Sequence, residues 1–340
     1  MYPRDQASLD PKTSRRALRT RRIMGSAKEL TLEVLRLLVL YPHDEQAHRK
    51  IGVSKEETAA RLCKVLPRPS GVLMTADDGR KLQCLLYMEP MLGPSVAIGV
   101  HAWNIGPLII APDAPGNTVS TMLDKSLAAL EVPADFLIAR VPSADANATK
   151  GLQEAGFVVV SGEAVAVAKL SEPAQIEPKS AGFAPLEPEL LDSVLEIACD
   201  CMQCTSFACN HGLDRDHVCR FSRLDLESYI YEKDKNGVVA LDSDGYAVGF
   251  ATYSFNSDIK TPPVHGVGSM DQLCVSANGE SMPLETSLGT RVLEELAVGG
   301  VETVITRTTM NDTSAKIESL KKIGFEVTHS NLVLRRGNLH

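Results

Sequence analysis

The sequence predicts a mixed α/β fold made of two copies of one domain, and three observations support this prediction. The chain has 340 residues, a length that suits two domains of roughly 100–200 residues each. In its second half the expected elements follow the order β-β-β-α-β-α-β, which indicates a mixed sheet, antiparallel at first and with a crossover later. Residues 136–170 and 303–335 also share one pattern: an apolar strand, an Asn-containing loop, a helix, Leu-x-x-x-Gly-Phe and a final strand.

Self-similarity along a chain indicates a structural repeat. A Gly directly after a helix fits a left-handed end cap, and the following Phe packs the returning strand. The matched residues are Leu152, Gly156 and Phe157 in the first copy and Leu320, Gly324 and Phe325 in the second.

The first half is expected to open with two helices and continue with strands. Ser54 followed by Glu57 is a capping-box pattern that starts the second helix. Prolines and a glycine at 67–71 then break the chain. We expect helices at 28–41, 54–65, 118–130 and 147–155, strands at 72–74, 81–88, 96–101, 136–141 and 157–170, and a short apolar run at 107–111.

The second half follows a Pro-containing linker and begins with helices. Asp244-Gly245 between two apolar runs is a strong hairpin signal. We expect helices at 187–201, 214–232, 284–297 and 312–322 and strands at 238–242, 246–255, 269–276, 301–309 and 325–334. The expected domains are a basic mobile tail at 1–28, an N-terminal domain at 29–170, a linker at 171–182 and a C-terminal domain at 183–340.

Charge and hydropathy disfavour two classes of partner. The chain has 35 Lys and Arg against 43 Asp and Glu, a net charge of -8, and an acidic body disfavours non-specific binding to nucleic acid. No apolar run reaches the roughly 18 residues that a membrane span needs. With eight cysteines and no secretory signal pattern, we expect a cytoplasmic protein whose thiols are free or bound to metal.

Four segments of the second copy resemble the GCN5-related N-acetyltransferase (GNAT) superfamily: GYAVGFATYSF at 245–255, MDQLCVSANGE at 270–280, LETSLGTRVLEEL at 284–296 and the stretch 306–325. A tandem chain with Val141, Pro142 and Asp145 before Leu-x-x-x-Gly-Phe is similar to the TDP-fucosamine acetyltransferase group. The resemblance implies a tandem GNAT-like fold with a partial, degenerate first copy. It also implies transfer of an acetyl or other acyl group from acetyl-CoA, or another acyl-CoA, to a primary amine of a small molecule, an amino sugar among them.

The resemblance also implies where the coenzyme binds. The family holds the pyrophosphate on backbone N–H groups at a helix start, with Arg/Gln-x-x-Gly-x-Gly/Ala. Here Leu284 replaces the first residue of that motif, and the alternative is an ordinary helix start after Pro283. A bulged strand and a gap between two strands would take the pantetheine arm. The expected contacts are Ser287, Leu288, Gly289 and Thr290 for the phosphates, the backbone of Leu273, Cys274 and Val275 for the thioester, and Asn311 for the arm.

Catalysis by the family often uses a Tyr as the acid that protonates the leaving thiolate, and this chain has Leu320 at that position. Ser319 or Cys274 could serve instead, the thiolate could leave unassisted, or the domain could be inactive. The base that deprotonates the amine is expected among Asp271, His265 and Glu280. His211 and Asp216 are expected nearer the acceptor.

Five cysteines gather in residues 199–219, together with two histidines. Zinc ligation and buried free thiols are the two interpretations. The cluster is formed by Cys199, Cys201, Cys204, Cys209, Cys219, His211 and His217. Two other functions stay open: a non-catalytic GNAT-fold sensor or interaction module, and a zinc-stabilised binding protein. The expected partner is a small-molecule amine, without nucleic acid or membrane, and a homodimer is left open as an assembly.

Overall fold

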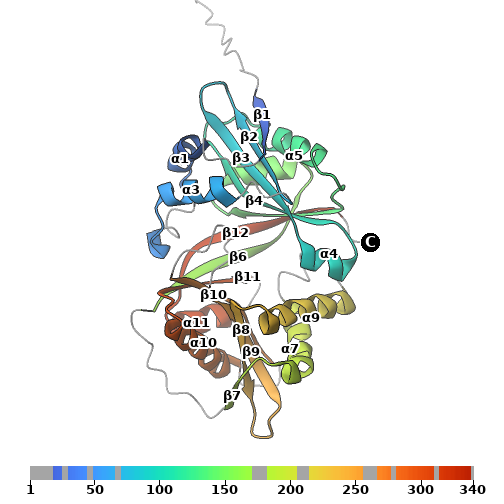
Figure 1. Cartoon of the computed structure of the whole chain (residues 1–340), viewed down its shortest axis with the longest axis vertical. Coiled ribbons are helices and arrows are strands. Elements are labelled where there is room, and N and C mark those ends of the chain that lie inside the picture. Colours follow the sequence, from blue (N-terminus) through green and yellow to red (C-terminus); the bar gives the residue numbers. More distant parts are fainter. Residues whose placement is uncertain are drawn as a thin grey trace, which may run out of the picture.

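The computed structural model describes residues 18–24, 30–43, 49–65, 70–170, 182–204, 214–255, 266–276, 281–309 and 314–337. Their strands form one 12-stranded sheet in the order β1-β2-β3-β4-β5-β12-β6-β11-β10-β9-β8-β7 (Figure 1). The pairs β4–β5 and β10–β11 are parallel and the others are antiparallel. The predicted mixed α/β fold is therefore confirmed.

The first half matches its expected elements with two exceptions. One is the strand expected at 96–101. The other is β1 (Arg19–Ile23), which pairs with β2 although residues 1–28 were expected to be a mobile tail. The capping box of α3 is present, with the Ser54 N–H donating to Glu57 Oε2 at 3.0 Å and the Glu57 N–H donating to Ser54 Oγ at 3.1 Å. The elements are β1 (Arg19–Ile23), α1 (Thr31–Leu40), α3 (Lys55–Val65), β2 (Val72–Asp77), β3 (Leu82–Pro90), α4 (Leu92–Ile98), β4 (Ala102–Ile110), α5 (Thr118–Ala128), β5 (Phe136–Pro142), α6 (Ala146–Glu154) and β6 (Val158–Lys169).

The strand expected at 96–101 is wrong, because residues 96–98 belong to α4 and residues 99–101 form no strand. A short apolar run fits a buried strand and a short helix equally well. Gly99 ends the helix in the left-handed region at φ 75°, where a glycine has no steric penalty. The chain is then free to start β4 at Ala102.

The second half contains the expected hairpin between β8 and β9. Asp242 Oδ1 accepts hydrogen bonds from the N–H groups of Asp244 and Tyr246, and Gly245 has φ 84°. The elements are β7 (Gly182–Pro185), a 3₁₀ turn (Pro188–Leu190), α7 (Leu191–Cys204), α9 (Arg215–Tyr231), β8 (Lys235–Leu241), β9 (Ala247–Ser254), β10 (Val267–Val275), α10 (Ser281–Val298), β11 (Thr303–Thr309), α11 (Ser314–Lys322) and β12 (Glu326–Arg336). Edge strand β7 was not predicted.

The two copies exchange their last strands. In each copy the Phe after the Gly donates its N–H to the matched Leu carbonyl, Phe157 to Leu152 and Phe325 to Leu320, both at 3.0 Å. The strand that follows then crosses to the other copy: β12 lies between β5 and β6, and β6 pairs with β11. The sheet is continuous through the molecule because of this exchange.

Helices cover both faces of the sheet. Leu332 of β12 packs in the cluster under α5 and α6 and lies opposite Gly162 of β6, while Ala166 packs in the cluster under α10 and α11. Alternate strand residues share a face, so these four helices cover the same face. The opposite face is covered by α1 and α3 over one half and by α7 and α9 over the other.

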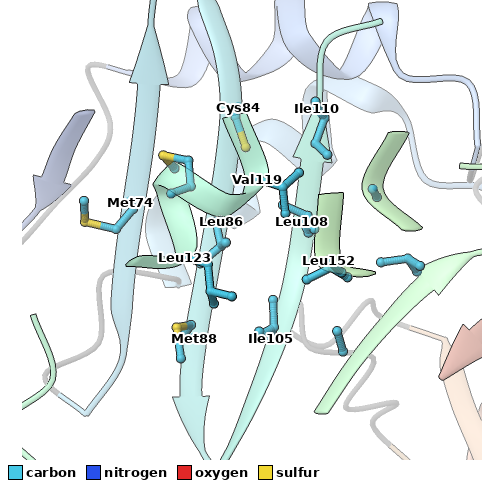
Figure 2. Packing of buried hydrophobic residues seen from close by; sticks show 14 of the residues in the cluster. Met74, Cys84, Leu86, Met88, Ile105, Leu108, Ile110, Val119, Leu123 and Leu152 are labelled. Atoms are coloured by element: carbon cyan, nitrogen blue, oxygen red, sulfur yellow. The ribbon is translucent and has the colours of Figure 1, made fainter. Parts of the chain in front are cut away.

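The largest cluster lies in the first half. Figure 2 shows side chains of β3 and β4, including Leu86 and Ile105, meeting Leu123 from α5 and Leu152 from α6. Among the described helices, none is long and apolar enough to span a bilayer.

Candidate active site

A gap opens between β10 and β11, as the sequence led us to expect. The parallel pairing runs from Val267–Thr303 to Met270–Thr306 and then stops. Yet β10 continues to Val275 and β11 to Thr309, each bonded to its other neighbour, β9 or β6. We call the space between these unpaired ends the second wedge, and its apex is the Met270–Thr306 pair.

One edge of the second wedge offers backbone donors. The Ser276 N–H donates to the Val248 carbonyl in β9 at 2.9 Å. N–H groups alternate between the two edges of a strand, so the Cys274 N–H also points to β9, whereas those of Leu273 and Val275 point into the wedge. Of the three predicted backbone contacts, the structure therefore gives this orientation to Leu273 and Val275 only.

A bulge at the apex turns two consecutive polar side chains towards α9. The register between β10 and β9 shifts between Met270 and Gln272, which places one extra residue, Asp271, in β10. Met270 and Leu273 pack under α10, while Asp271 and Gln272 both contact groups on the other face. Asp271 Oδ2 accepts a hydrogen bond from Ser254 Oγ at 2.8 Å, and Gln272 Nε2 donates to Asp225 Oδ2 of α9.

Asp225 and Tyr229 complete the group around the bulge. Burial raises the pKa of Asp225 to about 6, and the nearby Asp271 charge adds to this, while Lys235 and the hydrogen bond from Gln272 act against it. Burial, followed by the charges of Asp271 and Asp225, raises the pKa of Tyr229 far above its usual range. Tyr229 therefore stays protonated near neutral pH, while a carboxyl with a pKa near 6 is suited to exchange protons.

Sequence reasoning missed Asp225 and Tyr229, although a signal was present. Ser222, Asp225 and Tyr229 follow helical spacing along α9, on the side where Leu226 is fully buried. A polar stripe within the buried side of an amphipathic helix indicates a polar partner inside the fold. That partner is the bulge of β10.

The predicted phosphate-binding residues lie inside α10 and not at its start, because the helix expected from residue 284 begins earlier. The helix begins at Ser281 and accommodates Pro283 in its first turn, where a missing N–H costs little. Ser287 Oγ donates back to the Pro283 carbonyl at 2.9 Å. Leu288 is in the core, Thr290 donates its hydroxyl to the Thr286 carbonyl at 2.8 Å, and a Cβ on Gly289 would lie 2.4 Å from Ile323 Cδ1. The N–H groups without a helical partner belong instead to residues 281–284.

Two of the three predicted catalytic side chains are buried in packed parts of the fold. Cys274 is buried in the cluster under α7, beside Phe250. Ser319 is fully buried between α10 and α11, where its hydroxyl donates to Glu285 Oε2 at 3.0 Å. Leu320, at the position of the missing acid, is a core residue. Asp271 is the predicted catalytic residue that the structure places at the apex.

For most of the other predicted site residues, the structure describes no geometry. Asn311, His265, Glu280 and His211 lie outside the described residues. Asp216 is exposed in the first turn of α9.

The cysteine cluster differs from both interpretations at two positions. Cys199 of α7 and Cys219 of α9 form a disulfide, so they are neither free thiols nor zinc ligands in this form. Cys201 is partly buried and forms no disulfide, whereas Cys209 and the side chain of Cys204 lie outside the described residues. In the described part of the chain, no three His, Cys, Asp or Glu side chains are placed to hold a metal.

No protein-family profile matches the sequence, and no curated protein is significantly similar to it. Solved structures are similar in fold. A GCN5-related N-acetyltransferase from Sphaerobacter thermophilus has a TM-score of 0.56 and 15% identity over 94% of this chain and 95% of its own. A tandem GNAT protein from the clavulanic acid biosynthesis pathway has a TM-score of 0.53 and 13% identity over 94% and 98%.

A third neighbour is described as a glucosamine N-acetyltransferase region of a fungal multi-domain GH3 β-N-acetylglucosaminidase. It has a TM-score of 0.57 and 12% identity, over 97% of this chain and 39% of that longer one. At such low identity the likeness establishes the architecture alone. Together with the wedge, the bulge and the repeated halves, it shows that this chain has the tandem GCN5-related N-acetyltransferase fold.

Proposed function

We propose that this protein is an N-acyltransferase that moves an acetyl or other acyl group from acyl-CoA to a primary amine of a small molecule. The observation behind the proposal is the second wedge, where β10 and β11 part after Met270–Thr306 beside a bulge that presents Asp271. An extended thioester arm fits such a gap in the manner of an added strand, since the β10 edge turns the N–H groups of Leu273 and Val275 towards it.

The wedge edge supplies the electrophilic help that acyl transfer needs. The N–H groups of Leu273 and Val275 point into the gap, where they would bind the arm and the thioester carbonyl oxygen. As the amine attacks, negative charge develops on that oxygen, and one oriented N–H donor of this kind contributes roughly 3–4 kcal/mol to the transition state. The first turn of α10, residues 281–284, offers N–H groups of the kind that bind phosphate.

The carboxylates at the bulge supply the base. An amine reacts only when its nitrogen is unprotonated, so Asp271, exposed at the apex, takes the proton from the ammonium group. Asp225, with its pKa raised to about 6 by burial, and the protonated Tyr229 form the polar surroundings of that transfer. The nitrogen lone pair then bonds to the carbonyl carbon, the carbon–sulfur bond breaks, and the second proton leaves the nitrogen through solvent to the departing thiolate. With a thiol pKa of roughly 8.5, the thiolate departs without an acid at Leu320.

The acceptor is proposed to be a small amine, with amino sugars as one class. This follows the resemblance to the TDP-fucosamine acetyltransferase group, and the name of the fungal neighbour supports testing glucosamine. A cytoplasmic location, a homodimer, and the absence of nucleic-acid and membrane partners remain predictions.

Thermal unfolding with saturating acetyl-CoA and longer acyl-CoAs tests the first step. A ligand that binds only the folded chain raises its stability, so we expect a higher Tm with at least one acyl-CoA. An amine panel with free-thiol detection then tests transfer. No stabilisation by any acyl-CoA would contradict the proposal, and stabilisation without thiol release would indicate a sensor of acyl-CoA.

A further inference from the structure

A polar patch lies where the strands of the two copies interleave. It consists of Arg140 of β5, Ser161 and Glu163 of β6, Arg307 and Thr309 of β11, and Asn331 of β12, and we call it the junction patch. All six occupy alternate positions on the face covered by α7 and α9 in the second half, since each lies two or four residues along its strand from a buried residue of that face: Ile138, Val165, Ile305 or Val333. The junction patch is thus on the same face as Asp271 and Asp225.

The strand register sets these residues in adjoining rows. Glu163 lies directly opposite both Thr309 and Asn331. Arg140 lies opposite Val333, which in turn lies opposite Ser161. Neighbouring strands are about 4.8 Å apart, so the patch spans about 14 Å across the four strands from β5 to β11.

The repeat relates the two ends of the patch. Arg140 and Arg307 occupy the same place in the matched strands FLIARVP and TVITRTT. Each is also the first residue beyond the last parallel pair of its copy, Ile105–Ala139 or Met270–Thr306. Arg307 is therefore at the apex of the second wedge, across from Asp271.

The floor of the patch is buried and lacks hydrogen-bond partners. Ser161 and Thr309 are 8% and 5% exposed, and neither hydroxyl has a partner. Asn104 of β4 lies on the same face, opposite Ile138, which precedes Arg140 by two residues. It is 2% exposed, and its Nδ2 has no hydrogen-bond partner. Buried polar atoms are rarely left unsatisfied, so three of them on one face indicate a ligand or ordered water.

The chemistry of the patch favours an anion. Glu163, 5% exposed, accepts two hydrogen bonds from Arg140 Nε, at 3.0 and 3.1 Å to its two oxygens. The patch also contains the exposed guanidinium of Arg307, two hydroxyls and an amide, and each of these groups can donate a hydrogen bond. Carboxylate and phosphate oxygens accept from such donors with charge-assisted hydrogen bonds.

We propose that the junction patch binds an anionic group, a carboxylate or a phosphate, of the acceptor whose amine is acylated at Asp271. This inference rests on the proposed function and narrows it to amines that also carry an oxyanion. The amine then lies at the apex and the anion along β11, β6 and β12, within reach of both copies. The strand exchange would thus be what builds the acceptor site.

Matched pairs of amines test the inference on the full chain. Ethanolamine against O-phosphoethanolamine and glucosamine against glucosamine 6-phosphate probe phosphate, and cadaverine against lysine probes carboxylate. In calorimetric titration without acyl-CoA, we expect the anionic member of at least one pair to bind about 10-fold or more tightly. Which pair responds identifies the oxyanion.

Variants on the two faces of the same strands provide the control. Arg307→Gln and Thr309→Val are expected to abolish the preference for the anionic member. Arg336→Gln and Thr308→Val alter the opposite face, because these residues lie opposite Leu137 and Ala164, and should leave the preference intact. Circular dichroism shows whether each variant is folded.

Two results would overturn the inference: no preference in any pair, or a preference that survives both patch variants. Acyl-CoA binding is measured on the same preparations. If acyl-CoA binds and no anion preference exists, only the junction patch fails. If the preference exists and no acyl-CoA binds, the patch remains a binding site and the acyltransferase proposal fails.

Discussion

The two copies contain the same gap between strands but differ in what surrounds it. In the first copy, β4 and β5 are parallel from Ala102–Phe136 to Ile105–Ala139 and then part, as β10 and β11 do. The Ala111 N–H donates to the Gln83 carbonyl at 2.8 Å. The N–H groups of Leu108 and Ile110 therefore face this first wedge, as those of Leu273 and Val275 face the second.

The chemistry at the two apices is different. Gly106 and Pro107 stand in the first copy where Asp271 and Gln272 stand in the second. Val141 packs with Leu108 and Ile110 in one buried apolar cluster, whereas the matched strand position in the second copy is Thr308. Both copies therefore have a wedge, whereas Asp271 and Asp225 are present at the apex of the second copy only. The first copy is therefore expected to support the sheet without catalysing the reaction.

The largest effect should come from the apex carboxylate. Asp271→Asn removes the proposed base while keeping a hydrogen-bond acceptor for Ser254, so turnover should fall about 10²–10⁴-fold with little change in Tm. Asp113→Asn in the first copy, an exposed residue paired with Lys81, is the control and should leave turnover unchanged. Steady-state thiol release measures both, and equal rates for Asp271→Asn and wild type would remove Asp271 from the chemistry.

Proline substitutions test directly which of the two wedges binds the acyl-CoA arm. Leu273→Pro deletes an N–H that faces the wedge and no ladder hydrogen bond, a position where proline is tolerated in a strand. Compared with Leu273→Ala, which loses the same side-chain packing, it should lower turnover about 10²–10³-fold.

Leu108→Pro against Leu108→Ala repeats this comparison in the first wedge, where no such difference is expected. Titration calorimetry should accordingly give one acyl-CoA per chain. Two per chain, or equal effects of both prolines, would show that the first wedge is also a coenzyme site.

The helix pairs of the two copies are joined differently, which predicts a third contrast. In the described residues α1 and α3 meet through apolar side chains such as Leu37 and Leu62, whereas Cys199 and Cys219 tie α7 to α9 across 20 residues. Closing a loop of that length stabilises a protein by about 3 kcal/mol. Cys199→Ala with Cys219→Ala should lower the free energy of urea unfolding by about that amount, and reductant should have no further effect on the double variant. Equal stability of both forms would show that the disulfide does not form in solution.

Local patterns predicted what depends on local structure. The hairpin at Gly245, the capping box at Ser54 and the matched Gly156 and Gly324 each need a backbone geometry that few residue types provide. The gap beside β10 was expected from family resemblance, and Asp271 was proposed because it lies at a strand end facing that gap. These features needed no knowledge of distant contacts.

What depends on tertiary pairing was missed. The alternation of apolar and polar residues in β12 does not show whether this strand pairs with β11 of its own copy or with β5 of the other copy. Either pairing would bury the same face of β12. The start of α10 at Ser281 was placed too late because Pro283 was taken as a boundary, although proline is accepted in a first turn. Asp225 acquires its role only when the β10 bulge turns Gln272 towards it.

The smallest effect expected is a dependence of stability and turnover on pH. It should come from Asp225 of the second copy, because the described residues of the first copy place no matching carboxyl at its apex. Burial raises the pKa of Asp225 from its ordinary value near 4 to about 6, so between these values the folded chain binds more protons than the unfolded one. The contribution of Asp225 to stability should therefore decrease as the pH rises from about 4 to about 6. Asp225→Asn removes this dependence and should raise the Tm at pH 7, because the asparagine carries no buried charge and still accepts from Gln272.

Activity should respond to the same ionisation in the opposite sense. If the Asp225 carboxylate assists proton removal at Asp271, turnover rises with pH through about 6, and Asp225→Asn flattens that limb of the profile while lowering its plateau. Thermal unfolding from pH 4 to 8 and thiol-release rates over the same range measure the two effects. Asp135→Asn, which alters a carboxylate of the first copy that accepts the His101 N–H at 2.9 Å, should change neither profile near pH 6. A Tm difference between wild type and Asp225→Asn that stays constant from pH 4 to 8 would show that Asp225 is not buried as a charge, and Asp271 would then be the one carboxylate left in the proposed mechanism.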